Sequence, residues 1–166
     1  MEKEGLAVAD TSFVYALGKL VLWSAKPGFV DDKGGVLNTV NYNKLAYADP
    51  KLAPYGFAAQ QALQSMKLWD KLQSRLVTGE SIGQTYQFAA TGNAALAFIA
   101  LSQITKNGKV TEGSWWLVPA NLYAPIKQSA VQLAAAKDKQ TATAFLSFLK
   151  SEKAVEIIRS YGYGLP

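Results

Sequence analysis

The sequence contains no histidine and no cysteine among its 166 residues. This absence excludes the usual nucleophile–base pairs, thiolate chemistry, disulfides and zinc sites with nitrogen or sulfur ligands. Only 12 Asp and Glu are spread along the chain, so an acid–base or metal site would depend on scattered carboxylates. We therefore expect a protein that is not an enzyme and that has neither a cofactor nor a protein-coordinated metal.

Arginine is also scarce. Arg75 and Arg159 are the only two, although 17 Lys and Arg give a net charge of +5 and a pI near 9.3. A basic protein can bind nucleic acid, but phosphate and guanine recognition favours the bidentate guanidinium of arginine, and the lysines form no run. The sequence therefore favours a solvated lysine surface over a nucleic-acid interface. A steep salt dependence of DNA or RNA retention would instead support the nucleic-acid interface.

Long apolar runs are absent as well. The longest, Ala94 to Leu101, is far too short to span a bilayer. Residues 1–4 read Met-Glu-Lys-Glu, with acids where a secretory signal would be basic, so no signal peptide is expected here. The composition is 49% hydrophobic and 17% charged, which is enough apolar material for a folded core and excludes disorder.

Short apolar runs alternate with helical segments along the chain. The expected strands lie at 19–24, 44–48, 75–78, 94–101 and 114–118, with a possible connecting strand at 129–134. The expected helices lie at 54–66, 82–90, 140–150 and 152–161. Such alternation predicts an α/β fold with helices around a mainly parallel sheet.

Two strand–turn–helix junctions are candidate anion sites, at 53–56 and 79–83. The free N–H groups and the dipole of a helix N-terminus both favour negative charge, and Gly56 would let the backbone approach a ligand closely. Plain helix capping is the alternative at each junction. Neither junction fits a P-loop or dinucleotide-binding motif, so the sequence gives no support for nucleotide binding.

Other candidate features have structural interpretations that are favoured over functional ones. Trp115-Trp116 could stack on a ligand but suits core and strand-edge packing better. Residues 161–163 could form a ligand lid or a C-terminal cap, and Asp31-Asp32 could be a metal pair or a solvated turn. Glu80 beside Ser81 has no partner base, so no catalytic constellation emerges.

Taken in order, several segments resemble the substrate-binding proteins of molybdate ABC importers, which are type II periplasmic binding proteins. They are GKLVLWS (18–24), ADPKLAPYG (48–56), LWDKL (68–72), GESIGQ (79–84), FAATGN (88–93), FIALSQ (98–103), GSWWLVPA (113–120), AFLSFLKS (144–151) and IRSYGY (158–163). The resemblance covers essentially the whole chain and implies a periplasmic receptor with two lobes that delivers its ligand to a membrane ABC permease.

In this family, a tetrahedral oxyanion such as molybdate or tungstate is held by neutral donors. The resemblance implies that Tyr55 and Ile82 donate backbone N–H groups at the two helix starts. Fixed N–H donors match a dianion without a counter-charge, which fits the absence of arginine there. Some members add a tyrosine where this chain has Ala100, so that side-chain donor is absent or replaced.

The family opens with a strand–helix–strand–helix unit that has no counterpart here, so the chain resembles roughly the last two-thirds of the mature protein. We expect a three-layer α/β/α lobe at 43–124 and an incomplete lobe with hinge segments at 1–42 and 125–166, with 20–24 in the incomplete lobe. Half the anion donors would be missing, which predicts weakened affinity. Apolar helix faces after Gln140 would favour a homo-oligomer or a domain swap. A self-associating fragment that binds no ligand is the alternative.

Overall fold

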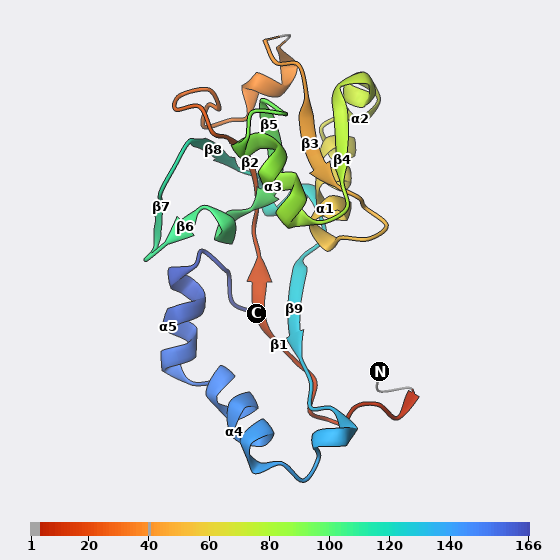
Figure 1. The fold of residues 1–166 in the computed structure, drawn as a ribbon, viewed down its shortest axis with the longest axis vertical. Helices are drawn as coiled ribbons and strands as arrows, with labels where there is room; N and C mark the ends of the chain where they lie inside the picture. The colour runs from red at the N-terminus through yellow and green to blue at the C-terminus, as the bar shows by residue number, and fades with distance from the viewer. Residues whose placement is uncertain (1–3, 40) are drawn as a thin grey trace.

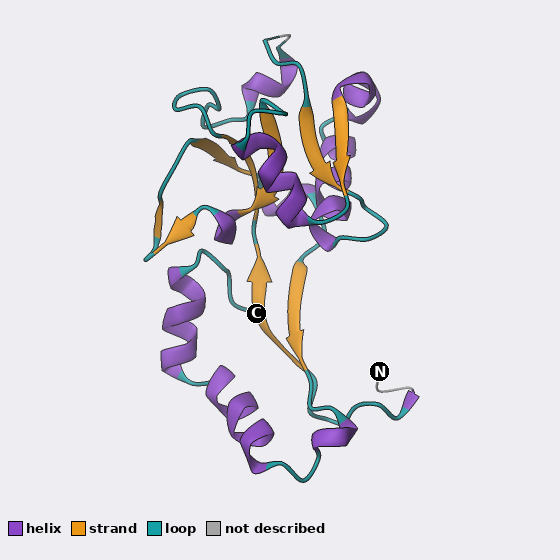
Figure 2. Ribbon diagram, viewed as in Figure 1, coloured by secondary structure: helices purple, strands orange, loops and turns teal. Residues whose placement is uncertain are grey.

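The computed structural model describes residues 4–39 and 41–166, which form two lobes joined by extended segments (Figure 1). The larger one, here called the sheet lobe, contains a five-stranded sheet with three helices. The smaller one, here called the ribbon lobe, contains a two-stranded ribbon and the last two helices. Figure 2 shows that these helices lie beside the ribbon and not over the large sheet.

The strands are β1 Phe13–Gly18, β2 Leu20–Ser24, β3 Leu45–Ala48, β4 Leu76–Gly79, β5 Leu96–Ala100, β6 Thr105–Lys106, β7 Lys109–Val110, β8 Ser114–Leu117 and β9 Ile126–Ala130. The α-helices are α1 Pro54–Ser65, α2 Trp69–Leu72, α3 Ile82–Ala90, α4 Gln140–Leu149 and α5 Glu152–Ser160. Short 3-10 turns lie at η2 Gly35–Asn38, η3 Gln73–Arg75, η4 Leu101–Gln103, η5 Ala120–Leu122 and η6 Ala134–Ala136.

The large sheet has the order β4-β3-β5-β2-β8. Strand β3 runs parallel to β4 and β5, whereas β2 runs antiparallel to both β5 and β8. The prediction of a mainly parallel sheet is therefore wrong for the β2–β8 side. Direction is a tertiary property, because the same apolar run can pair in either sense.

Strand β2 also corrects the expected division of the chain. The sequence predicts that 20–24 belongs to the incomplete lobe, but β2 lies inside the large sheet, between β5 and β8. All five of its residues are buried. This apolar strand needs cover on both faces, which only a sheet with helices on each side provides.

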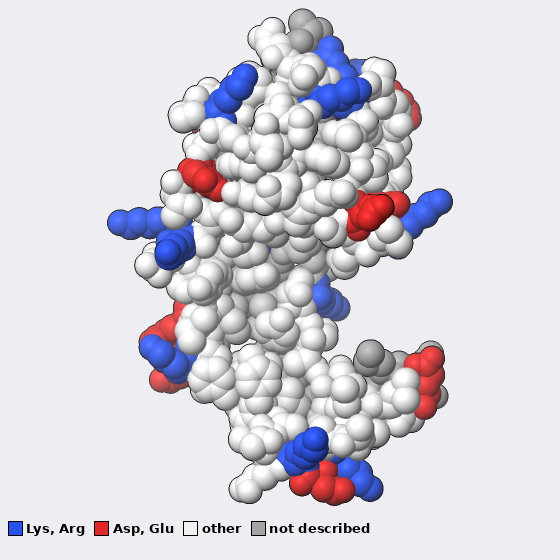
Figure 3. All heavy atoms as spheres, viewed as in Figure 1, with Lys and Arg blue, Asp and Glu red and all other residues white. Residues whose placement is uncertain are grey.

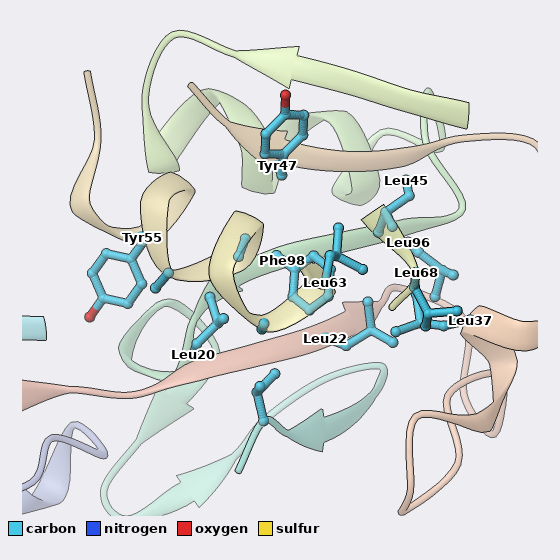
Figure 4. Packing of buried hydrophobic residues seen from close by; sticks show 14 of the residues in the cluster. Leu20, Leu22, Leu37, Leu45, Tyr47, Tyr55, Leu63, Leu68, Leu96 and Phe98 are labelled. Atoms are coloured by element: carbon cyan, nitrogen blue, oxygen red, sulfur yellow. The ribbon is translucent and has the colours of Figure 1, made fainter. Parts of the chain in front are cut away.

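Helices α1 and α3 cover opposite faces of the sheet. One core lies between α1 and the sheet and includes Leu22, Leu63 and Phe98 (Figure 4). The other lies on the α3 side and includes Trp23 and Ile99. The sheet lobe is therefore the three-layer α/β/α arrangement that the sequence predicted.

The ribbon lobe is held by two strands that are distant in sequence. Strand β1 pairs antiparallel with β9, and Gly18 is the partner of Ile126 at the end nearest the sheet lobe. The C-terminal segment returns to this point, where Leu17 and Gly164 exchange backbone hydrogen bonds of 2.9 and 2.8 Å. The expected connecting strand at 129–134 is thus shifted to 126–130, and β1 was not predicted.

The tryptophan pair at 115–116 and the C-terminal residues lie at the border of the sheet lobe. Trp116 packs against the core, as expected, whereas Trp115 is 38% exposed on the edge strand β8. Tyr163 lies within the C-terminal segment that packs back on the sheet lobe, where its hydroxyl accepts a hydrogen bond from the Ser102 hydroxyl at 3.2 Å. This contact agrees with the cap interpretation.

Candidate anion-binding site

The two predicted helix starts follow neighbouring strand ends. Ala48, the last residue of β3, is the register partner of Gly79, the last residue of β4. Gly56 in the first turn of α1 lies against the end of β3, because a Cβ there would collide with the carbonyl oxygen of Ala48. Gly79 lies against the first turn of α3, where a hypothetical Cβ would be 3.0 Å from the Thr85 backbone nitrogen. The two helix N-termini therefore meet at one edge of the sheet.

The start of α1 leaves one backbone donor unused. Pro54 has no N–H, and the N–H groups of Gly56 and Phe57 both donate to the Ala53 carbonyl, at 2.9 and 3.1 Å. The N–H of Tyr55 has no acceptor inside the helix, as is general for the first turn. The first turn contains no acidic side chain. The positive end of the α1 dipole is therefore available to an external anion.

The start of α3 is capped, yet it also leaves donors. The Ser81 hydroxyl accepts from the Gln84 N–H at 3.2 Å, and the Ser81 carbonyl accepts from the Thr85 N–H at 3.0 Å. The N–H groups of Ile82 and Gly83 precede these and have no acceptor within the helix. No acidic side chain lies in this first turn either. Capping and anion binding are thus compatible here, because they use different N–H groups.

Gln103 connects the start of α3 to the end of β5, the third of the parallel strands. Its Oε1 accepts from the Ala100 N–H at 3.0 Å, and its Nε2 donates to the Ile82 carbonyl at 3.1 Å. The Ile82 carbonyl shares a peptide plane with the Gly83 N–H, so the Gln103 amide also orients that donor. Sequence reasoning missed Gln103. The only signal was an amide side chain three residues after the substituted Ala100.

The structure brings Tyr55 and Ile82 to the same edge. Tyr55 is only 8% exposed, and the partly buried Ile82 packs against the core cluster that contains Tyr55. Arg75 donates to the carbonyls of Thr39 and Tyr42 beside the start of β4, at the opposite end of that strand from Gly79. Arg159 lies in α5 of the ribbon lobe. The arrangement is chemically a set of fixed neutral donors.

The Asp31-Asp32 pair is part of a turn. The Asp31 carboxylate accepts from the N–H groups of Lys33, Gly35 and Val36 at 2.9 to 3.0 Å. These bonds, that of Gly35 first, lower the pKa of Asp31 because they stabilise the charged form. Across residues 4–39 and 41–166, no group of three or more Asp or Glu could hold a metal ion.

A cavity of about 790 Å³ lies at the other end of the strands from the helix starts. It is next to the end of β2 and the starts of β3 and β5. Its lining includes Lys26, Phe29 and Tyr42. The Tyr42 hydroxyl already donates to the Leu37 carbonyl, and Lys26 lies over the Phe29 ring. These polar groups are used inside the lobe, so we place the candidate site at the helix starts. In the described part of the chain, no helix is long and apolar enough to cross a membrane.

The chain is similar to named binding proteins over nearly its whole length. It is 55% identical over 165 residues to the molybdate-binding protein ModA of Azotobacter vinelandii, and 53% identical over 162 residues to that of Rhodobacter capsulatus. The matched regions cover 99% and 97% of this chain but only 66% and 62% of the length of these two relatives.

Solved structures agree on the fold. The periplasmic molybdate-binding protein of Azotobacter vinelandii superposes with a TM-score of 0.93 at 45% identity, covering 99% of this chain and 72% of that one. A periplasmic thiamin-binding protein, at 16% identity and a TM-score of 0.66, shows the fold alone and covers 99% and 61%. The predicted fold, that of periplasmic binding proteins with a partial second lobe, is therefore confirmed. Residues 1–164 also match the family described as bacterial extracellular solute-binding protein, and the chain belongs to that family.

Proposed function

We propose that this chain is part of the substrate-binding component of a molybdate or tungstate ABC importer and binds a tetrahedral oxyanion through backbone N–H groups. Tyr55 and Ile82 are the proposed donors. The observation that carries the proposal is the meeting of two helix N-termini, with unused N–H groups and no acidic side chain in either first turn, at one sheet edge. Relatives at 55% and 53% identity are named molybdate-binding proteins. The role is binding, not catalysis.

The wider role follows from the same relatives. A periplasmic location and delivery to a membrane ABC permease are proposed for the protein to which this chain corresponds, because a solved relative is named a periplasmic molybdate-binding protein. No nucleic-acid partner is proposed. On the face shown in Figure 3, lysines and arginines are scattered around the periphery among acidic groups and form no stripe. A nucleic-acid interface would instead need a continuous basic surface.

The affinity of this chain is expected to be weak. A donor set on one side of an anion leaves its other side in water, where the dianion keeps its hydration. Calorimetric titration of molybdate to about 1 mM should still give saturable heat. Displacement by tungstate, but not by sulfate or phosphate, is the expected pattern. No heat at this concentration would refute binding by this chain.

Removing the α3 cap provides a directed test. Ser81→Ala deletes the acceptor of the Gln84 N–H, which costs about 1 kcal/mol of stability and frays the first turn that holds Ile82. We expect molybdate affinity to fall about fivefold. Ser151→Ala is the matched control, because Ser151 caps α5 in the ribbon lobe through the Ala154 N–H at 3.3 Å. It should lose similar stability and no affinity; equal affinity losses would contradict the site.

A second proposal is self-association through the exposed face of α4. None of the residues of α4 is buried, and Phe145 and Phe148 are 59% and 43% exposed. A second copy of the chain would remove this apolar area from water. We expect concentration-dependent association in sedimentation velocity, reduced by Phe145→Glu. Phe57→Glu, at a 49% exposed position on α1, is the control. A monomer at all concentrations would overturn this proposal.

A further inference from the structure

Tyr55 reaches from the candidate anion site to the junction of the two lobes. Its backbone begins α1, while its ring lies over Gly18, where β1 leaves the ribbon lobe. A Cβ at Gly18 would overlap the Tyr55 hydroxyl oxygen and lie 2.9 Å from its Cζ. Figure 4 shows the hydroxyl pointing away from Leu63 and Phe98, out of the core. One residue therefore contacts both the anion edge and the connecting strand.

Both connecting strands pass this point. Gly18 pairs with Ile126, the first residue of β9, and the Cγ2 of Ile126 lies 3.1 Å from the same hypothetical Cβ. On the other side of Gly18, the Leu20 N–H donates to the Tyr123 hydroxyl at 3.2 Å. A rotation of one lobe against the other must move these strands past the Tyr55 ring. The ring therefore contacts the segment through which a change in the angle between the lobes would pass.

The Tyr55 hydroxyl is buried and has no hydrogen-bond partner among the described residues. Tyr163, Tyr123 and Tyr15 lie around it. Burial first, and then these neighbouring hydroxyl groups, raise its pKa well above its usual range. It is therefore a neutral donor at every physiological pH. An unpaired buried hydroxyl raises the free energy of its arrangement, and a small rotation that supplied an acceptor would lower it.

We propose that Tyr55 is a positioning residue that links anion binding to the angle between the lobes. Its N–H contacts the anion, and its hydroxyl gains an acceptor from the surrounding tyrosines when the lobes rotate on binding. This inference rests on the proposed function, because the anion is the one bound at the Tyr55 and Ile82 donors. It adds a role for the side chain, which backbone recognition alone does not require.

Tyr55→Phe tests the role of the hydroxyl, because it keeps the ring and the N–H donor. We expect the molybdate dissociation constant to rise about three- to tenfold, while the urea midpoint without anion stays the same or rises. Tyr47→Phe is the matched control: Tyr47 is also 8% exposed, and Figure 4 places it apart from Tyr55. A residue with a merely structural role would not show an affinity loss without a stability loss.

A double-mutant cycle tests the contact with the connecting strand, and it needs no anion. Gly18→Ala introduces a methyl group that overlaps the Tyr55 hydroxyl and should lower the urea midpoint. Tyr55→Leu removes the atoms that the methyl group meets. The double variant should therefore be more stable than the sum of the two single changes predicts. Additive effects would contradict the proposed contact between the Tyr55 ring and Gly18.

The two proposals can fail separately. If the unmodified chain does not bind molybdate, the proposed function is refuted. The proposed link between anion binding and the lobe angle is then refuted as well. If the chain binds molybdate and Tyr55→Phe matches both the unmodified chain and Tyr47→Phe, the link alone is refuted. Reduced affinity in Tyr55→Phe together with a non-additive cycle supports it.

Discussion

Gly56→Ala is expected to abolish molybdate binding and to lower the free energy of unfolding by about 3 kcal/mol. The added Cβ would collide with the Ala48 carbonyl oxygen and lie 2.6 Å from its carbonyl carbon. Both are backbone atoms of β3, so no side-chain rotation can relieve the contact. Helix α1 would have to move away from the strand end, and the Tyr55 N–H would move with it.

Gly83→Ala is the control for the stability effect of this substitution. Gly83 occupies the first turn of α3, and a Cβ there would meet only the Ser81 hydroxyl oxygen at 3.8 Å. Alanine is the better helix former, so this change should raise stability by up to about 1 kcal/mol. Urea denaturation compares the two variants, and calorimetry measures molybdate binding to Gly56→Ala. If Gly56→Ala kept the stability and affinity of the unmodified chain, the proposed seating of α1 would be wrong.

Phe98→Ala is expected to have the largest effect on stability, a loss of roughly 3–5 kcal/mol. Phe98 is 0% exposed and lies in β5, the central strand of the large sheet, facing α1. Its removal leaves a cavity between two layers that cannot both relax. Because a domain of this size has a total stability of about 5–15 kcal/mol, this loss should lower the urea midpoint by a large fraction.

Near-ultraviolet circular dichroism and the urea midpoint measure this loss. Phe57→Ala removes the same ring from a 49% exposed position on α1 and should cost less than about 1 kcal/mol. Similar losses for the two variants would mean that the core between α1 and the sheet is not the main source of stability.

The helix starts at the candidate site were predictable because their signals are local. Pro54 suits the first helical position, and Ser81 accepts a bond from three residues ahead. Both features depend on a few neighbouring residues, so α1 and α3 begin where the sequence indicated. The role of Tyr55 and Ile82 as donors came instead from the family resemblance and stays a proposal.

The contacts that complete the site could not be predicted, because they join distant segments. Gln103 reaches Ile82 across 21 positions of sequence. The Tyr55 ring meets Gly18 only because β1 and α1 converge at the junction of the lobes. Strand β1 has an apolar sequence, Phe13–Gly18, so the strand itself had a local signal. Its pairing with β9, more than a hundred residues away, did not.

The sequence by itself determined the α/β class and the approximate bounds of most strands and helices. It also excluded cysteine and histidine chemistry. Each of these follows from composition or from residues within one turn or one strand. Only the tertiary structure decided that β2 lies antiparallel inside the large sheet and that Tyr55 borders the lobe junction. Strand order, strand direction and side-chain contacts across the fold depend on which apolar surfaces pack together, and many pairings satisfy the same local pattern.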